Sequence, residues 1–216
     1  MKKAIIFIFA ITLIGVGIIT IHSQKEFNDN LNSNEIGEKH QDEIYMEVNI
    51  MADYAVIDPK DLYNYSDIVV LANYEKDKAT KISSSGQAFT TSDFKITKVL
   101  KNKKDIYLNE TLSARYIGGV VSLKDVSNSN SESLKKKVNL EGLTEEELER
   151  KKIKFSLEDI GDKSLKENKE RILFLNYDEK TGEFIVVADN YGMISQKDGT
   201  IFDVKTKSYK SFSFLK

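Results

Sequence analysis

Four acidic residues are the side chains whose type and placement best suit acid–base chemistry: Asp67, Asp93, Glu183 and Asp189. Each lies in or beside a strand-like segment, so their carboxylates would project from strands or strand ends. Two carboxyl groups about 5–10 Å apart are what glycoside hydrolysis requires. Acids at strand ends and turns are also ordinary surface residues, and the chain has no Trp for the aromatic platforms of a polysaccharide cleft. We therefore assign no catalytic residue among them.

Nucleophilic catalysis has little support in the sequence. The chain has no Cys, which excludes thiol nucleophiles, disulfides, zinc ribbons and iron–sulfur clusters. Ser195 and Ser211 have ordinary strand settings, and no G-x-S-x-G elbow is present. A Ser–Lys pair stays open as an alternative, because Lys and Arg together number 32 and pairs arise readily by chance.

Metal and cofactor motifs are also lacking. The oxygen-rich segments 178–183 and 189–192 have calcium-binding side chains, but neither matches an EF-hand loop, and hairpin turns explain both. His22 and His40 have no third ligand nearby. No Gly-rich phosphate or dinucleotide loop occurs. We predict neither a metal site nor a cofactor.

The carboxyl end combines cations with aromatic rings, in the order Lys205, Lys207, Tyr209, Lys210, Phe212 and Phe214. One interpretation is a stacking platform for single-stranded nucleic acid or another anionic surface. The other is an edge strand whose aromatics belong to the core and whose lysines oppose self-association. A net charge of −2 and a pI near 5.9 favour the second, so we predict no nucleic-acid partner.

The chain begins with a hydrophobic segment, and the elements that would position these residues come after it. After Met1-Lys2-Lys3, Ala4–Ile21 is an 18-residue run without a charge. As a helix it spans about 27 Å, close to the hydrocarbon thickness of a bilayer. It predicts a single-pass membrane helix with the rest of the chain outside. The alternative is a signal peptide cleaved at Gly15-Val16-Gly17 or Ile21-His22-Ser23, followed by secretion, although neither site fits cleavage well.

Composition divides the remainder into segments. Residues 1–23 are the signal-anchor or signal peptide, and residues 24–51 are a polar, flexible stalk. Residues 52–216 form an extracytoplasmic β domain, interrupted by a charged and partly disordered insertion at 124–169. The insertion begins with Ser-rich linker material at 127–133, and its capping box at Thr144 predicts a short helix over 144–152.

The domain itself has strand-like periodicity. Asp58 and Pro59 predict a short helix that ends near Tyr65 or Ser66. Apolar and alternating segments predict six to eight short strands, and polar residues 75–87 predict a loop between two of them. With two short helices and no βαβ unit, the chain is mainly β. We predict a small antiparallel β-barrel of OB-like size, with a β-sandwich as the alternative.

Five short motifs follow one another in a characteristic order over residues 60–204: Ser66–Val70, Val99–Lys101, Gly118–Gly119, Ile172–Leu175 and Asp198–Ile201. In this order the chain resembles a diffuse group of uncharacterised secreted or membrane-anchored Gram-positive bacterial proteins with a small β-barrel domain. The resemblance implies an extracytoplasmic β domain and no particular activity.

These observations predict a non-catalytic binding or interaction module tethered at the cell envelope, with the membrane contacted through residues 4–21. Its partner is an envelope protein or polymer, bound on loops that include 76–87 and 124–169. The alternatives are a cell-envelope hydrolase that uses Asp/Glu or Ser–Lys chemistry and a structural protein without a biochemical activity.

Overall fold

The computed structural model describes residues 21–22, 43–50, 58–157, 170–203, 206 and 208–215. The strands are β1 (Ile21–His22), β2 (Glu43–Ile50), β3 (Ile68–Ile82), β4 (Ala88–Asn102), β5 (Thr111–Ile117), β6 (Gly119–Ser122), β7 (Lys151–Leu157), β8 (Glu170–Asp178), β9 (Glu183–Val186), β10 (Met193–Lys197), β11 (Thr200–Asp203) and β12 (Ser208–Lys210). The helices are α1 (Pro59–Tyr65), α2 (Leu123–Asn128), α3 (Glu132–Lys137) and α4 (Glu145–Arg150), with 3₁₀ turns η1 (Asp189–Gly192) and η2 (Ser213–Leu215).

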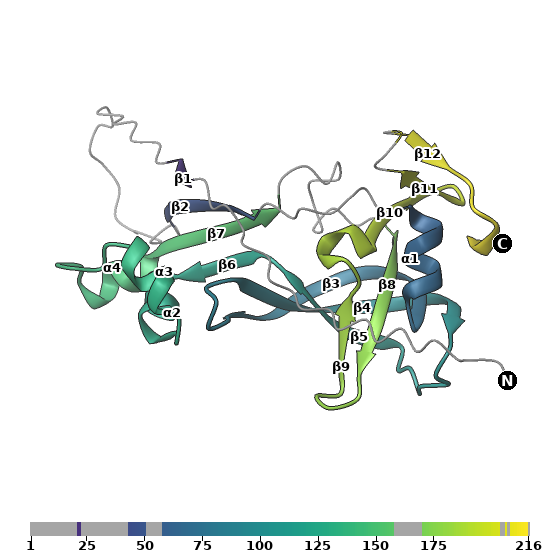
Figure 1. The fold of residues 1–216 in the computed structure, drawn as a ribbon, viewed down its shortest axis with the longest axis horizontal. Helices are drawn as coiled ribbons and strands as arrows, with labels where there is room; N and C mark the ends of the chain where they lie inside the picture. The colour runs from purple at the N-terminus through teal and green to yellow at the C-terminus, as the bar shows by residue number, and fades with distance from the viewer. Residues whose placement is uncertain are drawn as a thin grey trace, which may run out of the picture.

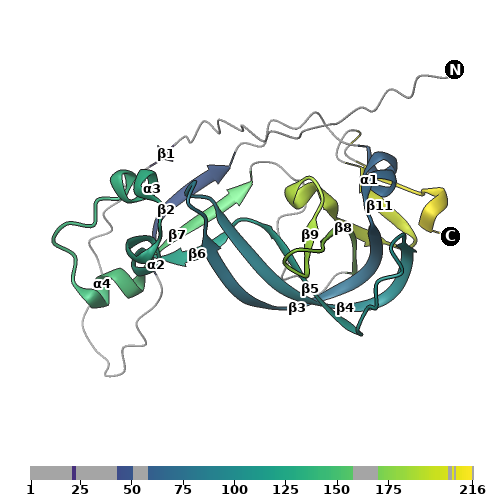
Figure 2. The same cartoon turned by 60° about the horizontal axis from the view of Figure 1, so that its bottom comes forward.

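The described chain is mainly β, as predicted, and is arranged as two sheets (Figure 1). Helices α2, α3 and α4 lie at one end of the molecule, and α1 lies near the other end beside the C-terminus. The described residues contain four α-helices, two more than predicted. The long strands β3 and β4 run between the two ends and curve strongly along their length (Figure 2).

Helix α1 forms where its local signals predict. The Asp58 carboxylate accepts the backbone N–H of Lys60 at 2.8 Å, and Pro59 occupies the first turn. At the other end, the Ser66 hydroxyl donates to the Leu62 carbonyl at 2.6 Å. Leu62 is buried, so α1 is held against the outer side of β3 and β8 through an apolar contact.

The segment predicted as a loop over 75–87 is mostly strand. β3 continues to Ile82, and only residues 83–87 turn the chain into β4. The β3–β4 register shifts at several bulges, which breaks the apolar alternation that sequence periodicity detects. Cross-strand polar contacts replace it: Ser92 donates to Asp77 at 2.6 Å, and the hydroxyls of Thr80 and Thr90 lie 3.0 Å apart.

Five strands of the larger sheet form a continuous circuit of pairings. β3 pairs with β4 and β8, β4 pairs with β5, and β9 pairs with both β5 and β8. All of these pairs are antiparallel except β5–β9. Their inward side chains form one core, which contains Ile68, Val70, Phe94, Leu112 and Leu173.

The chain between β5 and β8 supplies β6 and β7 to a second sheet, which also contains β1 and β2 and has its own core. β7 pairs in parallel with β2 and antiparallel with β6. Helices α2 and α3 pack against this sheet through Leu123, Val126 and Leu134. Residues 43–50, predicted as part of the stalk, are strand β2 of this sheet.

The Ser-rich residues 127–133, predicted as linker, lie in and between α2 and α3. Serine supplies the caps: Ser122 forms a capping box with Asp125, and the Ser131 hydroxyl accepts the Leu134 N–H at 3.3 Å. The predicted capping box of Thr144 with Glu147 is confirmed, and α4 follows it. Residues 158–169 of the predicted insertion lie outside the described residues.

The predicted membrane segment lies outside the described residues except at its end, where Ile21–His22 form β1 and pair with β2. Across the residues that are described, no helix is both long and apolar enough to cross a membrane.

Candidate functional site

Asp93 is held in a small polar cluster on β3, β4 and β5. The Ser113 hydroxyl donates to Asp93 Oδ1 at 2.5 Å. Lys78 Nζ donates to Ser113 Oγ at 3.2 Å and lies 3.7 Å from the Asp93 carboxylate. The cluster follows from the register, because Asp93 and Ser113 face each other across β4 and β5.

This cluster has the composition of a Ser–Lys pair but not the expected geometry. A lysine that serves as general base must present a neutral amine, which desolvation favours. The Lys78 side chain is 50% exposed, so it is not desolvated, and its amine lies 3.7 Å from the Asp93 carboxylate. The serine proton is also already directed to Asp93 rather than to Lys78.

Glu183 is engaged by a cation. Its carboxylate lies 2.9 Å from Arg115 Nη1, and the Arg115 guanidinium lies 5.7 Å from the centre of the Phe89 ring. Arg115 reaches both because β5 lies between β4 and β9. The pair ties the short strand β9 to β5.

Asp67 joins the start of β3 to the end of β8. Its carboxylate accepts the Tyr177 backbone N–H at 3.3 Å and lies 3.2 Å from Lys104 Nζ. The Asp67 N–H in turn donates to Asn176 Oδ1 at 3.2 Å. Hydrogen bonds to Glu179 and then to Asp67 raise the pKa of Lys104. Asp67 therefore lies at the junction of β3 and β8, where Lys104 balances its negative charge.

Asp67, Asp93 and Glu183 therefore have three different sets of partners. The side chain of Asp189 lies outside the described residues, as does that of Asn190 in the predicted oxygen-rich segment. Where side chains are described, no group of three His, Asp or Glu residues is placed to hold a metal ion.

The sequence did not reveal a polar network in which the exposed Asp77 meets the buried Ser92 and Tyr116. Ser92 Oγ lies 2.6 Å from Asp77 Oδ1 and 3.1 Å from the Tyr116 hydroxyl, which is 3.3 Å from the same carboxylate oxygen. Burial raises the pKa of Tyr116, and the Asp77 charge adds to the effect. The Tyr116 phenol thus stays protonated as a donor and joins three strands.

The aromatic side chains near the C-terminus pack against the domain. The Phe214 ring stacks on Tyr63 of α1 at 4.6 Å and meets Phe174 edge-on at 6.1 Å. Phe212 stacks on Phe214 at 5.4 Å. Both phenylalanines contact the core beneath α1, which matches the second interpretation of this segment.

The cations of the same segment are only partly described. Lys210 is paired with Asp203 at 2.6 Å, while Lys205 and Lys207 lie outside the described residues. The Tyr209 ring meets Phe202 at 5.5 Å and is half exposed.

The two segments predicted to bind a partner meet in space. The turn 83–87 at the tip of the β3–β4 hairpin lies against α3. Gly86 approaches so closely that an added Cβ would lie 2.8 Å from Ser131 Oγ and 3.3 Å from Leu134 Cβ. Ile82 and Ala88, on either side of the turn, contribute to the core beneath α2 and α3. We call the turn 83–87 with α2, α3 and α4 the hairpin–helix platform.

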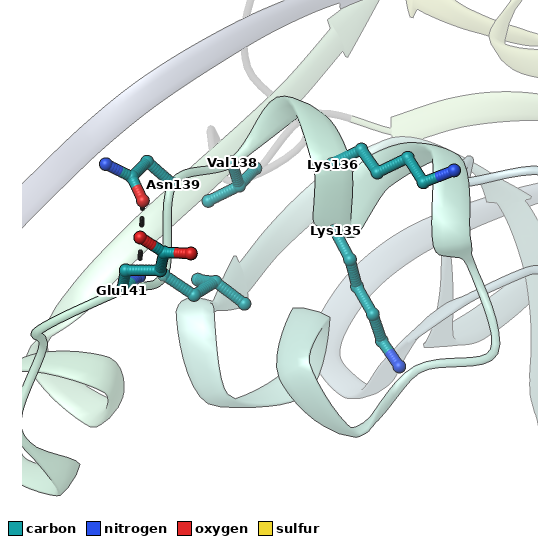
Figure 3. A pocket seen from close by; sticks show the side chains of 6 residues that line it. Lys135, Lys136, Val138, Asn139 and Glu141 are labelled. Carbon is teal, nitrogen blue, oxygen red and sulfur yellow. Dashed lines mark hydrogen bonds between the residues drawn. The ribbon is translucent and has the colours of Figure 1, made fainter.

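The platform carries a shallow, open depression of about 520 Å³ at the end of α3 (Figure 3). It is lined by Lys135, Lys136, Val138, Asn139, Leu140 and Glu141. The Lys135 and Lys136 side chains extend from α3, and Asn139 Oδ1 accepts the Glu141 N–H at 3.2 Å on the other side.

The depression combines an unpaired cation with apolar surface. Lys135 lies 3.4 Å from Glu132, whereas in the described part of the chain no acidic side chain pairs with the exposed Lys136. Leu140, which also lines the depression, is half-buried. A protein segment with a carboxylate and an apolar side chain matches this surface in chemistry.

Comparison with known proteins gives no neighbour: no family model matches the chain, and no curated protein or solved structure is similar to it.

Proposed function

We propose that the protein is a non-catalytic, extracytoplasmic interaction module tethered at the membrane through the predicted run 4–21 without its last residue, because Ile21 pairs in β1. We further propose that it binds an envelope protein through the hairpin–helix platform. The observation that supports this most is the contact of Gly86 with α3, because it unites two separate polar segments into one surface backed by its own core. The engagement of Asp67, Asp93 and Glu183 in separate ion pairs favours binding over acid–base catalysis.

We further propose that the five-strand circuit is a small OB-like barrel rather than a sandwich. An OB fold is a five-stranded Greek-key barrel. Closure through β8–β9 and the parallel β5–β9 pair supports that description, as does the single apolar core within the circuit. A sandwich would instead stack two separate sheets face to face across the core. The barrel provides a rigid support from which the platform projects.

The test is capture of the partner from detergent-solubilised membranes with the full-length protein as bait. Lys136→Glu reverses the charge of the depression, and Lys103→Glu makes the same change in the exposed turn after β4. We expect one envelope protein to be retained by wild type and Lys103→Glu and lost from Lys136→Glu. Equal retention by all three proteins would contradict the platform as the binding surface.

A cell-envelope hydrolase is the second candidate, and the 3.2 Å contact between Lys78 Nζ and Ser113 Oγ is the observation that favours it. The purified full-length protein should be incubated with cell-wall polymer alongside Ser113→Ala and Lys78→Ala. Turnover by wild type that both variants abolish would overturn the non-catalytic proposal. We expect no turnover by any of the three.

A further inference from the structure

The pairing of β1 with β2 places the end of the apolar run at the edge of the second sheet. Ile21 is opposite Val48, and His22 is opposite Glu47 (Figure 1). Paired strands lie about 4.8 Å apart, so the chain that follows Ala4–Thr20 is within one strand spacing of β2. No spacer separates the apolar run from the folded domain.

This proximity has a consequence that depends on the proposed membrane anchor. A helix over Ala4–Thr20 is about 26 Å long, which matches the hydrocarbon core closely and brings residue 21 to the headgroup level. The β1–β2 pairing would then bring the edge of the second sheet to the same level. Residues 24–42 follow this point of attachment in the sequence.

β2 exposes two large apolar side chains together with Glu43 and Glu47, whose carboxylates pair with Arg150 at 3.3 Å and with Lys154 at 3.0 Å. Ile44 and Tyr45 are 47% and 40% exposed. The ammonium group of Lys151, on the neighbouring strand β7, lies 5.5 Å from the centre of the Tyr45 ring. Lys151 is itself paired with Glu147 at 3.4 Å, so it holds the Tyr45 ring in place rather than reaching outward. Tyr is enriched at membrane–water interfaces, where its ring is apolar and its hydroxyl remains hydrated.

We propose that β2 docks on the lipid surface into which the chain's own apolar run inserts, with Ile44 and Tyr45 at the headgroup level. This fixes which side of the domain faces the membrane. Helix α1 lies near the opposite end of the molecule from β2 (Figure 1). Tyr65, the last residue of α1, is 75% exposed and provides a matched aromatic position away from β2.

The absence of Cys makes a site-specific test possible, since one introduced thiol is the only one in the chain. The full-length variants Tyr45→Cys and Tyr65→Cys are labelled with an environment-sensitive fluorophore and reconstituted in vesicles of phosphatidylcholine and phosphatidylglycerol. Brominated lipids quench a fluorophore only when it reaches the bilayer. We expect several-fold stronger quenching at position 45 than at position 65, with circular dichroism showing that both variants are folded.

A third protein isolates the role of β1. His22→Pro in the Tyr45→Cys background removes a backbone donor and breaks the short pairing with β2. We expect the quenching at position 45 to fall to the level at position 65 while the protein still floats with the vesicles. Unchanged quenching would show that β1 does not position the domain and would overturn the inference.

Flotation separates the two proposals. If the protein floats with vesicles but positions 45 and 65 are quenched equally, the docking inference is wrong and the anchor stands. If the full-length protein does not float, the anchor is wrong and the docking inference fails with it.

Discussion

Gly86 lies against Leu134 so closely that a Cβ at position 86 would be 3.3 Å from the Leu134 Cβ and 2.8 Å from Ser131 Oγ. This contact seats the β3–β4 turn on α3. It also requires a backbone φ of +86°, which side chains of L-amino acids rarely adopt.

Replacing Gly86 with Ala should lower the free energy of unfolding by about 2–3 kcal/mol, because backbone strain and the contact with α3 act together. Gly142→Ala is the matched control. Its φ is +76°, but nothing lies within 4 Å of an added Cβ, so we expect a loss of only about 1 kcal/mol. Urea denaturation of the two variants measures the difference. Equal losses of unfolding free energy in the two variants would mean that the contact between the turn 83–87 and α3 adds nothing to the cost of a Cβ at position 86.

Tyr116→Phe should cost about 1 kcal/mol, because it removes the hydroxyl shared between Ser92 and Asp77. Tyr107→Phe, at a side chain that is 85% exposed, should leave the unfolding midpoint unchanged. An effect of equal size at both positions would show that the hydrogen bonds of the Tyr116 hydroxyl contribute nothing specific.

The same network predicts a pH dependence. Burial raises the native pKa of Tyr116 above its ordinary value of about 10, so the native state keeps a proton that the unfolded chain releases. This stabilisation is complete below pH ~10 and is lost as the pH rises through the native pKa. Urea midpoints between pH ~8 and ~11 should therefore fall less steeply in Tyr116→Phe than in wild type. Parallel curves would contradict the assignment.

Asp67 and Glu179 both contact Lys104 at 3.2 Å, but only the Asp67 carboxylate is largely buried and also accepts a backbone N–H. Asp67→Ala should thus destabilise the protein by about 1–3 kcal/mol. Glu179→Ala removes a carboxylate that is 73% exposed and should be close to wild type in thermal denaturation. If Glu179→Ala destabilised the protein more than Asp67→Ala, the stabilising carboxylate would be the exposed Glu179 rather than Asp67 at the β3–β8 junction.

The proposed anchor predicts that cell fractionation finds the full-length protein in membranes. Deleting residues 4–20 should move the protein out of the membrane fraction, since the remaining sequence has no comparable uncharged run. A shortened form found only in the culture medium would favour the cleaved signal peptide instead.

Sequence patterns predict the elements whose signals are local. Asp58 and Pro59 define the start of α1, and Thr144 with Glu147 defines the start of α4, because a cap is satisfied within a few residues. Local signals do not predict that residues 75–82 form a strand. Their strand conformation depends on pairing with β4 and on cross-strand contacts such as Asp77 to Ser92, which no local pattern encodes.

Long-range pairing also explains what is missed elsewhere. β2 pairs with β7, about a hundred residues later, and the alternation of Ile44, Met46, Val48 and Ile50 is a strand signal that the predicted stalk over residues 24–51 overlooked. In the candidate site, the sequence identifies both segments of the platform but not their contact at Gly86. The partners of Asp93 and Glu183 likewise depend on the register of β4, β5 and β9.

Photo-crosslinking in intact cells tests the central claim most directly. A photoreactive amino acid is placed at position 136, on the depression of the platform, or at the exposed position 107, which is outside the platform. The account predicts a discrete adduct with one envelope protein from position 136 and none from position 107. The same adduct from both positions, or an adduct from position 107 alone, would contradict it.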